Sequence, residues 1–384
     1  MSGRLVRWVC AAAVAGAVAA PLPASAVPEP GAGGERSVAG LLTDLQTLYQ
    51  ETEEATEAYD ATAEELARRR AQAEALTRKL AAARGSLYGS RVAAGRLARA
   101  QYQGRSTISP YVRLLLARDP QHALDQGHVV LRAEREQRAT VDRLVGAERT
   151  ADGLATRARA ALDRQLRLAA ERKKDRDAVR ARLDDVEQML ASLSPDQLAD
   201  MARLEERGTA TAQRALVTSG ALGSAARAPS KAGGAALSYA VRQIGKPYVW
   251  GAQGPGAFDC SGLTSQAWAH AGRRIPRTSQ QQWAKLPRVP LSRLRPGDLV
   301  VYFPRATHVA LYLGQGKVIQ APRPGSRVKV SPIAANPLLG AVRPDPGARP
   351  MSGYRPPSLP RGAMAGADEG YAAGAPGARR PVDG

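Results

Sequence analysis

Two long stretches of the sequence repeat apolar or small residues at alternating three- and four-residue spacing, the heptad pattern of coiled-coil helices. The first begins near Val38 and the second ends near Leu193, and each is about 65 residues long, roughly 100 Å as a helix. Equal lengths on either side of a break predict an antiparallel helical hairpin. Gly85, Gly89 and Gly95 should make the distal end of the first helix the softer part.

The segment between the two helices is predicted to form a small lobe at the tip of the hairpin, residues 104–130. Its run Gly104 to Pro110 breaks the helix, and residues 111–117 and 123–130 are each typical of a short apolar helix. His122 and His128 lie here six residues apart, without a third ligand at suitable spacing. We therefore expect no metal site in the lobe.

The first 26 residues have the pattern of an export signal. Arg4 and Arg7 precede an apolar run from Trp8 to Ala20, and Ala24-Ser25-Ala26 matches a small-x-small cleavage site. A retained membrane anchor is the alternative, but thirteen apolar residues are short against the roughly twenty needed to span a bilayer. The signal predicts a secreted, cell-wall-associated protein. Cys10 leaves with it, so the mature chain keeps a single cysteine.

The chain is strongly basic, with 55 Lys and Arg against 35 Asp and Glu. A net charge of +20 favours polyanionic partners. For an exported protein these are anionic wall polymers or the membrane surface, and no nucleic acid partner is expected. A solvated helical surface without a specific partner explains much of the excess equally well.

Aromatic residues indicate where the conventional core lies. All three Trp beyond the first ten residues and both Phe fall between residues 250 and 303. We predict this organisation: signal peptide 1–26, flexible start 27–37, coiled-coil region 38–218 with a further helix from Pro195 to about Val217, linker 219–234, globular domain 235–346, disordered tail 347–384.

The globular domain is predicted to be α+β. Three helices come first, at 235–245, 260–271 and 279–284. Short strands separated by turn signals follow, at 298–303, 308–313, 317–321, 327–331 and 340–343. Helices followed by closely spaced strands indicate an antiparallel meander covered by helices.

Cys260 stands directly after a glycine-rich run and directly before a predicted helix. A thiol on the first turn of a helix faces unpaired backbone N–H groups and the positive end of the dipole, both of which favour the thiolate. The thiolate needs a base, and His308 is the strong candidate downstream. Gln320, on the next apolar run, can accept a hydrogen bond from the imidazole. An inert buried cysteine is the alternative, and the surrounding motif weighs against it.

The order nucleophile, base, orienting group is that of papain-like cysteine peptidases. Tyr-x-Trp-Gly at Tyr248, Phe-Asp-Cys-Ser-Gly-Leu around Cys260, Pro-Gly-Asp-Leu at Pro296 and His-Val-x-Leu-Tyr-Leu-Gly at His308 resemble the NlpC/P60 family of cell-wall cysteine peptidases. The resemblance covers roughly residues 236–345 and implies a reduced papain-like fold. It implies cleavage of the bond between D-γ-glutamate and the diamino acid of peptidoglycan stem peptides, with no cofactor.

The resemblance also assigns roles to residues. Cys260 is the nucleophile, His308 the base, and Gln320 stands where many members have a histidine. An amide can orient an imidazole but cannot share its charge, so we expect activity to survive with a changed pH profile. The resemblance places the Tyr248 hydroxyl near the developing oxyanion. It also implies that Asp259 and Ser261 bind the free amino end of the stem peptide.

The helical region ahead of this domain resembles secreted wall hydrolases of Gram-positive bacteria that act in cell separation. In such proteins the coil restrains the peptidase until a membrane division complex, an ABC-transporter-like pair, engages it. A plain spacer or a dimerisation stalk remains open as an interpretation. So does a second class of function, a non-catalytic adaptor that binds wall peptides and activates another hydrolase. Amidase or acyl-transfer chemistry on the same triad also remains open.

Overall fold

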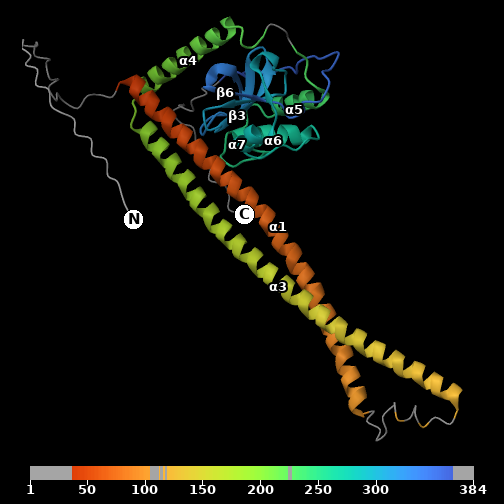
Figure 1. Ribbon diagram of the computed structural model, residues 1–384. Helices are drawn as coiled ribbons and strands as arrows, with labels where there is room; N and C mark the ends of the chain where they lie inside the picture. Colours follow the sequence, from red (N-terminus) through yellow and green to blue (C-terminus); the bar gives the residue numbers. More distant parts are fainter. Residues whose placement is uncertain (1–36, 104–111, 113–115, 117–118, 224–226, 366–384) are drawn as a thin grey trace, which may run out of the picture. The chain divides into compact units, whose positions relative to one another are not determined.

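The computed structural model describes residues 37–103, 112, 116, 119–223 and 227–365. The predicted signal peptide and flexible start lie almost entirely outside this part of the chain. Two helices, α1 (Val38–Gln103) and α3 (Pro120–Ala191), form an antiparallel pair, and a mixed helical and β-sheet domain follows them along the chain (Figure 1). No helix in the described ranges is long and apolar enough to cross a membrane.

Side chains that meet across the hairpin fix its antiparallel register. Thr62 Oγ1 donates to Asp175 Oδ2 at 2.7 Å, and Arg172 Nη2 donates to the Tyr59 hydroxyl at 2.7 Å. Farther along, Arg91 pairs with Glu148 at 3.2 Å. The predicted hairpin is therefore confirmed.

The predicted tip lobe differs from what the structure shows. Residues 123–130 are not a separate short helix, because α3 begins at Pro120 and continues without a break to Ala191. Asp119 caps this start by accepting a hydrogen bond from the Gln121 N–H at 2.9 Å, and proline is favoured at the first position of a helix. Most of residues 104–118 lie outside the described part of the chain.

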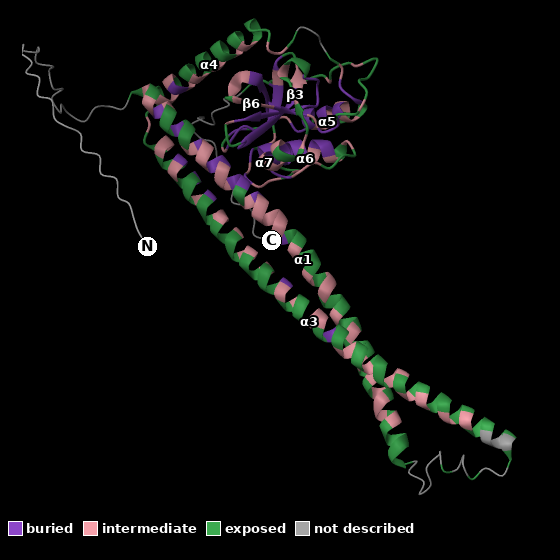
Figure 2. Cartoon of the chain, viewed as in Figure 1, coloured by how far each residue is buried: buried purple, intermediate pink, exposed green. Residues whose placement is uncertain are grey.

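Burial is concentrated at one end of the hairpin. The buried residues of α1 all lie between Leu41 and Leu66, and the rest of the helix is half-buried or exposed (Figure 2). Large apolar side chains farther out, including Tyr88, Tyr102 and Leu166, are more than half exposed. In the described residues, the distal part of the hairpin is therefore held together only by contacts between α1 and α3.

Helix α4 (Pro195–Thr218) connects the hairpin to the sheet. It starts at Pro195, as predicted, and Ser194 and Gln197 form the capping box at this start. Gln213 donates to the Gly316 carbonyl at 3.0 Å and accepts from the Ala334 N–H at 3.1 Å. These bonds fix α4 against the turn between the third and fourth strands.

The C-terminal domain contains three helices and six strands. The helices are α5 (Lys231–Val241), α6 (Cys260–His270) and α7 (Ser279–Lys285). The strands are β1 (Arg288–Val289), β2 (Leu299–Tyr302), β3 (His308–Gly314), β4 (Lys317–Gln320), β5 (Lys329–Pro332) and β6 (Leu338–Val342). Helix α5 starts earlier than predicted, inside the assumed linker, because Ser230 caps it by accepting from the Gly233 N–H at 2.9 Å.

The strands form one antiparallel sheet in the order β1-β6-β2-β3-β4-β5. Strands β2 to β5 make the predicted meander, and β6 returns to pair with β2. Helix α6 packs on β3, and the buried Trp268 donates its indole N–H to the Gly297 carbonyl at 3.2 Å. This packing holds the start of α6 over the start of β3.

The prediction of a disordered tail is wrong for residues 347–365. Met351 N–H donates to the Pro229 carbonyl at 2.9 Å, and Val330 N–H donates to the Ala363 carbonyl at 2.8 Å. Ala363 is buried. These backbone bonds, which composition does not reveal, hold the segment against the domain. Residues 366–384 lie outside the described part of the chain.

Candidate active site

Cys260 is the first residue of α6. The Asp259 side chain caps the helix, and its Oδ1 accepts the Gly262 N–H at 2.6 Å. Gly262 is required here, since a Cβ at this position would lie 2.2 Å from the Ala252 carbonyl oxygen. The cap and the close approach place the Cys260 thiol at the positive end of the helix dipole.

His308 is the first residue of β3, and its ring is held from one side. Its Nε2 lies 2.8 Å from Gln320 Oε1, and Gln320 Nε2 in turn donates to Ser331 Oγ at 2.9 Å. Because an amide oxygen only accepts, Nε2 carries the proton, which leaves Nδ1 as the nitrogen able to receive another. The Cys260 thiol contacts the backbone of Val309, the residue next to His308. The structure thus brings the three predicted catalytic residues into one site.

A buried charge network adjoins the thiol. Arg277 donates to both oxygens of Asp259, at 3.1 and 2.6 Å, and to Ser261 Oγ at 2.8 Å. Arg277 is only 7% exposed. It therefore orients both residues that flank Cys260, a role that the sequence analysis does not predict.

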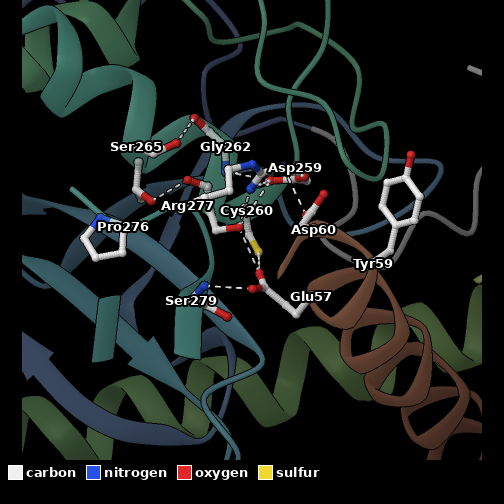
Figure 3. Close-up of polar contacts among 12 residues, drawn as sticks. Glu57, Tyr59, Asp60, Asp259, Cys260, Gly262, Ser265, Pro276, Arg277 and Ser279 are labelled. Atoms are coloured by element: carbon white, nitrogen blue, oxygen red, sulfur yellow. Dashed lines mark hydrogen bonds and ion pairs between the residues drawn. The ribbon is translucent and has the colours of Figure 1, made fainter. Parts of the chain in front are cut away.

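Helix α1 covers this site, as Figure 3 shows. Glu57 Oε1 lies 3.7 Å from Cys260 Sγ and accepts from Ser261 Oγ at 2.9 Å. Its other oxygen accepts the Ser279 N–H at 2.8 Å. With this carboxylate over it, the Cys260 side chain is buried.

The same helix also contacts His308, the predicted base. Glu53 stands one turn before Glu57, and its Oε1 lies 3.0 Å from His308 Nδ1. The contact is an ion pair when the imidazole is protonated. One turn after Glu57, Asp60 pairs with Arg277 at 3.1 Å. Three acidic residues of α1 therefore contact the base, the thiol and the charge network.

These contacts shift the titration of the site. Burial raises the pKa of Cys260 well above its usual range, and the carboxylates of Glu57, Asp259 and Glu53 add to this. Burial and Asp259 raise the pKa of Glu57 to about 7. For His308, burial lowers the pKa, but the charge of Glu53 and the bonds to Glu53 and Gln320 outweigh it, so the pKa is raised. The covered site therefore favours a neutral thiol beside a protonated imidazole.

Tyr248, the remaining predicted site residue, adjoins the thiol, whereas His270, the other histidine of the domain, does not. Tyr248 is buried, its backbone N–H donates to the Ser326 carbonyl at 2.9 Å, and the charge of Cys260 contributes, after burial, to raising its pKa. His270, at the far end of α6, packs on the Tyr239 ring at 4.5 Å between ring centres. Within the described ranges no group of three or more His, Cys, Asp or Glu side chains could hold a metal ion.

Sequence reasoning did not predict the acidic face of α1, although a signal was present. Residues 38–66 contain eight Asp or Glu and no Lys or Arg, whereas residues 67–103 contain nine Lys or Arg and one Glu. Residues 235–346 contain fifteen Lys or Arg and three Asp. This charge complementarity indicates which half of the helix docks on the domain.

Residues 245–339 match the family model of the NlpC/P60 family. A probable endopeptidase of Corynebacterium glutamicum strain R is 41% identical over 140 residues, which cover 36% of this chain and 66% of that protein. The peptidoglycan endopeptidase RipA of Mycolicibacterium smegmatis is 37% identical over 164 residues, which cover 38% of this chain and 32% of that protein. The chain thus spans less than two thirds of these relatives.

Among solved structures, the NlpC/p60 domain of the peptidoglycan hydrolase SagA is 36% identical and has a TM-score of 0.28. That alignment covers 29% of this chain and 97% of the SagA domain. The segment that matches the family model, residues 245–339, contains Cys260 and His308.

Proposed function

Because its C-terminal domain is an NlpC/P60 family domain, we propose that this chain is an exported cysteine endopeptidase that cleaves the D-γ-glutamyl–diamino acid bond of peptidoglycan stem peptides. The observation that carries the proposal is the site itself. The Cys260 thiol lies at a helix N-terminus and contacts the backbone of Val309, the residue after His308. Gln320 holds His308 Nε2, Glu53 faces Nδ1, and Glu57 lies over the thiol.

The reaction needs no group beyond these side chains. His308 Nδ1 takes the thiol proton, and the Cys260 sulfur attacks the γ-glutamyl carbonyl carbon. The tetrahedral oxyanion is stabilised by the Cys260 backbone N–H and the Tyr248 hydroxyl. His308 returns the proton to the leaving amine, which gives a thioester and a free amino group. Water then gives its proton to His308 and attacks the thioester, which releases a carboxylate and restores the thiol.

The residues on either side of Cys260 bind the stem peptide. Asp259 is held in place by Arg277, and Ser261 lies beside it. A carboxylate there suits the ammonium of the L-alanine that begins the peptide. The diamino acid then leaves on the His308 side.

Helix α1 acts as a regulatory arm that blocks this reaction. Glu57 occupies the place where a scissile carbonyl must approach the sulfur, and Glu53 holds the base nitrogen. These contacts favour the regulatory interpretation over a plain spacer. A partner that moves the hairpin would open the site, and the exposed apolar side chains Tyr88, Tyr102 and Leu166 offer it a surface. A membrane division complex is the partner that the coil's resemblance implies.

Digestion of purified stem peptides that begin with a free L-alanine tests the proposal. The chain from Val27 onward, with Glu53→Lys and Glu57→Lys to open the site, should release L-alanyl-D-glutamate, identified by mass. Adding Cys260→Ala should abolish the product. If other fragments appear, the assigned bond is wrong. If the Cys260→Ala variant still promotes wall cleavage by another hydrolase at the full rate, the adaptor function is supported instead. Mass analysis of the exported protein should find a mature start at Val27.

A further inference from the structure

A cavity of about 660 Å³ lies where α1, α4 and the C-terminal domain meet, and we call it the α1–α4 cavity. One face of α1, within residues 42–53, and one face of α4, within residues 204–219, line it. The domain contributes residues 334–338 and Gln320, which holds the His308 ring. Because three separate parts of the chain form its walls, the cavity is complete only while α1 is docked.

The α1–α4 cavity has room for a small molecule. Its volume is within the range of cavities that bind ligands in proteins, roughly 300–1,000 Å³. Small residues of α4, including Gly208 and Ala212, leave part of this space open. Its own helix backbone aside, a Cβ added at Gly208 would meet no heavy atom of the described residues within 4 Å.

Two carboxylates in the cavity wall are each only half engaged. Glu53 Oε1 contacts His308 Nδ1 at 3.0 Å, and Glu205 Oε1 accepts from Arg323 Nη2 at 2.6 Å. The second oxygen of each, Oε2, is buried and has no hydrogen-bond partner among the described residues. The two side chains are only 8% and 9% exposed. Since buried polar groups are normally hydrogen-bonded, both oxygens are suited to accept from a ligand in the cavity.

The wall indicates the chemistry of that ligand. A carboxylate oxygen only accepts hydrogen bonds, and it binds a charged donor best, so two of them favour two ammonium groups. Arg323 does not supply this charge to the free oxygens, since it already pairs with Glu205 and stacks on the Tyr49 ring at 4.5 Å. Much of the remaining wall is apolar, including Leu42 and Phe303, and suits an aliphatic chain between the two ammonium groups.

We propose that the α1–α4 cavity binds an aliphatic diamine, and that the bound diamine holds α1 on the domain and keeps Cys260 covered. A ligand that contacts Glu53 on α1 and Glu205 on α4 binds the docked form alone. By mass action it therefore shifts the equilibrium toward that form. The inference adds a small-molecule effector to the proposed regulatory arm and does not depend on which bond the enzyme cleaves.

Calorimetric titration of the native chain from Val27 onward with 1,6-diaminohexane tests the inference without any peptidase assay. We expect saturable binding of one diamine and no binding of 1,6-hexanediol, which has the same length and no charge. At about ten times the dissociation constant, the diamine should slow alkylation of Cys260 by iodoacetamide about tenfold. It should not slow alkylation in the Glu53→Lys/Glu57→Lys variant, which also shows that the amine does not consume the reagent.

Two variants of α4 locate the site. Glu205→Gln removes one of the two charges and should weaken diamine binding about tenfold, whereas Glu206→Gln, the same change at the exposed neighbouring residue, should not. Gly208→Leu fills the cavity, keeps both carboxylates and should abolish binding.

Three results would overturn the inference. The first is the absence of saturable diamine binding to the native chain. The second is equal binding of the diol, or equal diamine affinity in Gly208→Leu and Glu206→Gln, since the cavity and its charges would then not be the site. The third is faster alkylation of Cys260 with bound diamine, because the ligand would then favour the undocked form.

Discussion

His308 Nδ1, which is the nitrogen that must receive the Cys260 proton, lies 3.0 Å from Glu53 Oε1. The other ring nitrogen is already engaged by Gln320 at 2.8 Å. By raising the pKa of His308, Glu53 favours the imidazolium form, which cannot accept a proton from the thiol. This contact supports the proposed role of α1 as a regulatory arm.

Reversing the charges that hold α1 should open the site. In the variant Glu53→Lys/Glu57→Lys, the ion pair to His308 and the contact to the thiol are lost, and breaking a buried pair costs about 3–5 kcal/mol. We expect α1 to undock and Cys260 to react with iodoacetamide at least about 100-fold faster, which is the effect of ~2.7 kcal/mol.

Glu74→Lys is the matched control for this variant. It lies on the same helix, its side chain is 70% exposed, and its Arg78 contact at 3.9 Å is a surface pair. Its alkylation rate should equal that of the native chain. Equal rates in the double variant and the native chain would show that α1 does not restrain the thiol.

Docking of α1 should weaken as the pH rises. Glu57 has a pKa of about 7 when docked, above its usual value of 4.5, because burial and then Asp259 disfavour its charge. A group whose docked pKa is raised stabilises docking at low pH and loses this contribution as the pH rises through the docked pKa. Asp60, facing Asp259 and Arg277, and His308, facing Glu53, also have raised docked pKa values and act in the same direction.

Glu57→Gln isolates this effect, since the amide is a permanently neutral replacement of similar shape. The ratio of the Cys260 alkylation rate in the native chain to that in Glu57→Gln should rise between about pH 6 and pH 8, across the docked pKa. Taking a ratio removes the ordinary increase of thiol reactivity with pH. A ratio that is flat over this range would show that Glu57 does not titrate on undocking.

Several parts of the molecule could be predicted from the sequence because they depend on local pattern. Heptad spacing gave the antiparallel hairpin, and turn residues separated the strands of the β2–β5 meander. The two-residue strand β1 and the capped start of α5 at Lys231 were missed. Both depend on a distant partner: β6 for the first, and the Asp345 contact to Ser230 for the second.

The motif around Cys260 predicts its chemistry, but it does not indicate that α1 covers the thiol. Heptad spacing identifies the apolar positions of a helix. Helix α1 also buries polar and acidic residues on a second face, namely Glu53, Thr56, Glu57 and Asp60. The burial of these acidic residues is explained only by the basic domain, which follows more than a hundred residues later in the sequence. The contact between α1 and the C-terminal domain is therefore a tertiary contact, and its only signal in the sequence is the segregation of charge along α1.

Gln320 should set the pKa of the base. Its oxygen accepts from His308 Nε2 while Ser331 fixes its amide group. In the opened chain, Gln320→Glu places a buried carboxylate against the ring and should raise the His308 pKa by about one unit or more. Gln320→Ala should lower kcat about 10- to 100-fold through lost orientation. NMR titration of the imidazole checks the first result, and a pKa unchanged in Gln320→Glu would contradict it.

Arg277 should be essential for the stability of the domain as well as for docking. It pairs with Asp259 at 2.6 Å inside the domain and with Asp60 of α1 at 3.1 Å. Burial lowers the pKa of Arg277, but the charges of these acids outweigh it, so the pKa is raised. Arg277→Met would leave two buried carboxylates without a cation. We expect the free energy of unfolding to fall by about 3–5 kcal/mol.

Urea unfolding followed by tryptophan fluorescence measures this loss, because Trp250, Trp268 and Trp283 all lie in the domain. Asp60→Asn is the comparison, since it removes only the contact to α1 and keeps the Arg277–Asp259 pair. It should speed alkylation of Cys260 while leaving the unfolding of the domain nearly unchanged. If Arg277→Met unfolds at the same urea concentration as the native chain, the Asp259 cap of α6 does not depend on this cation.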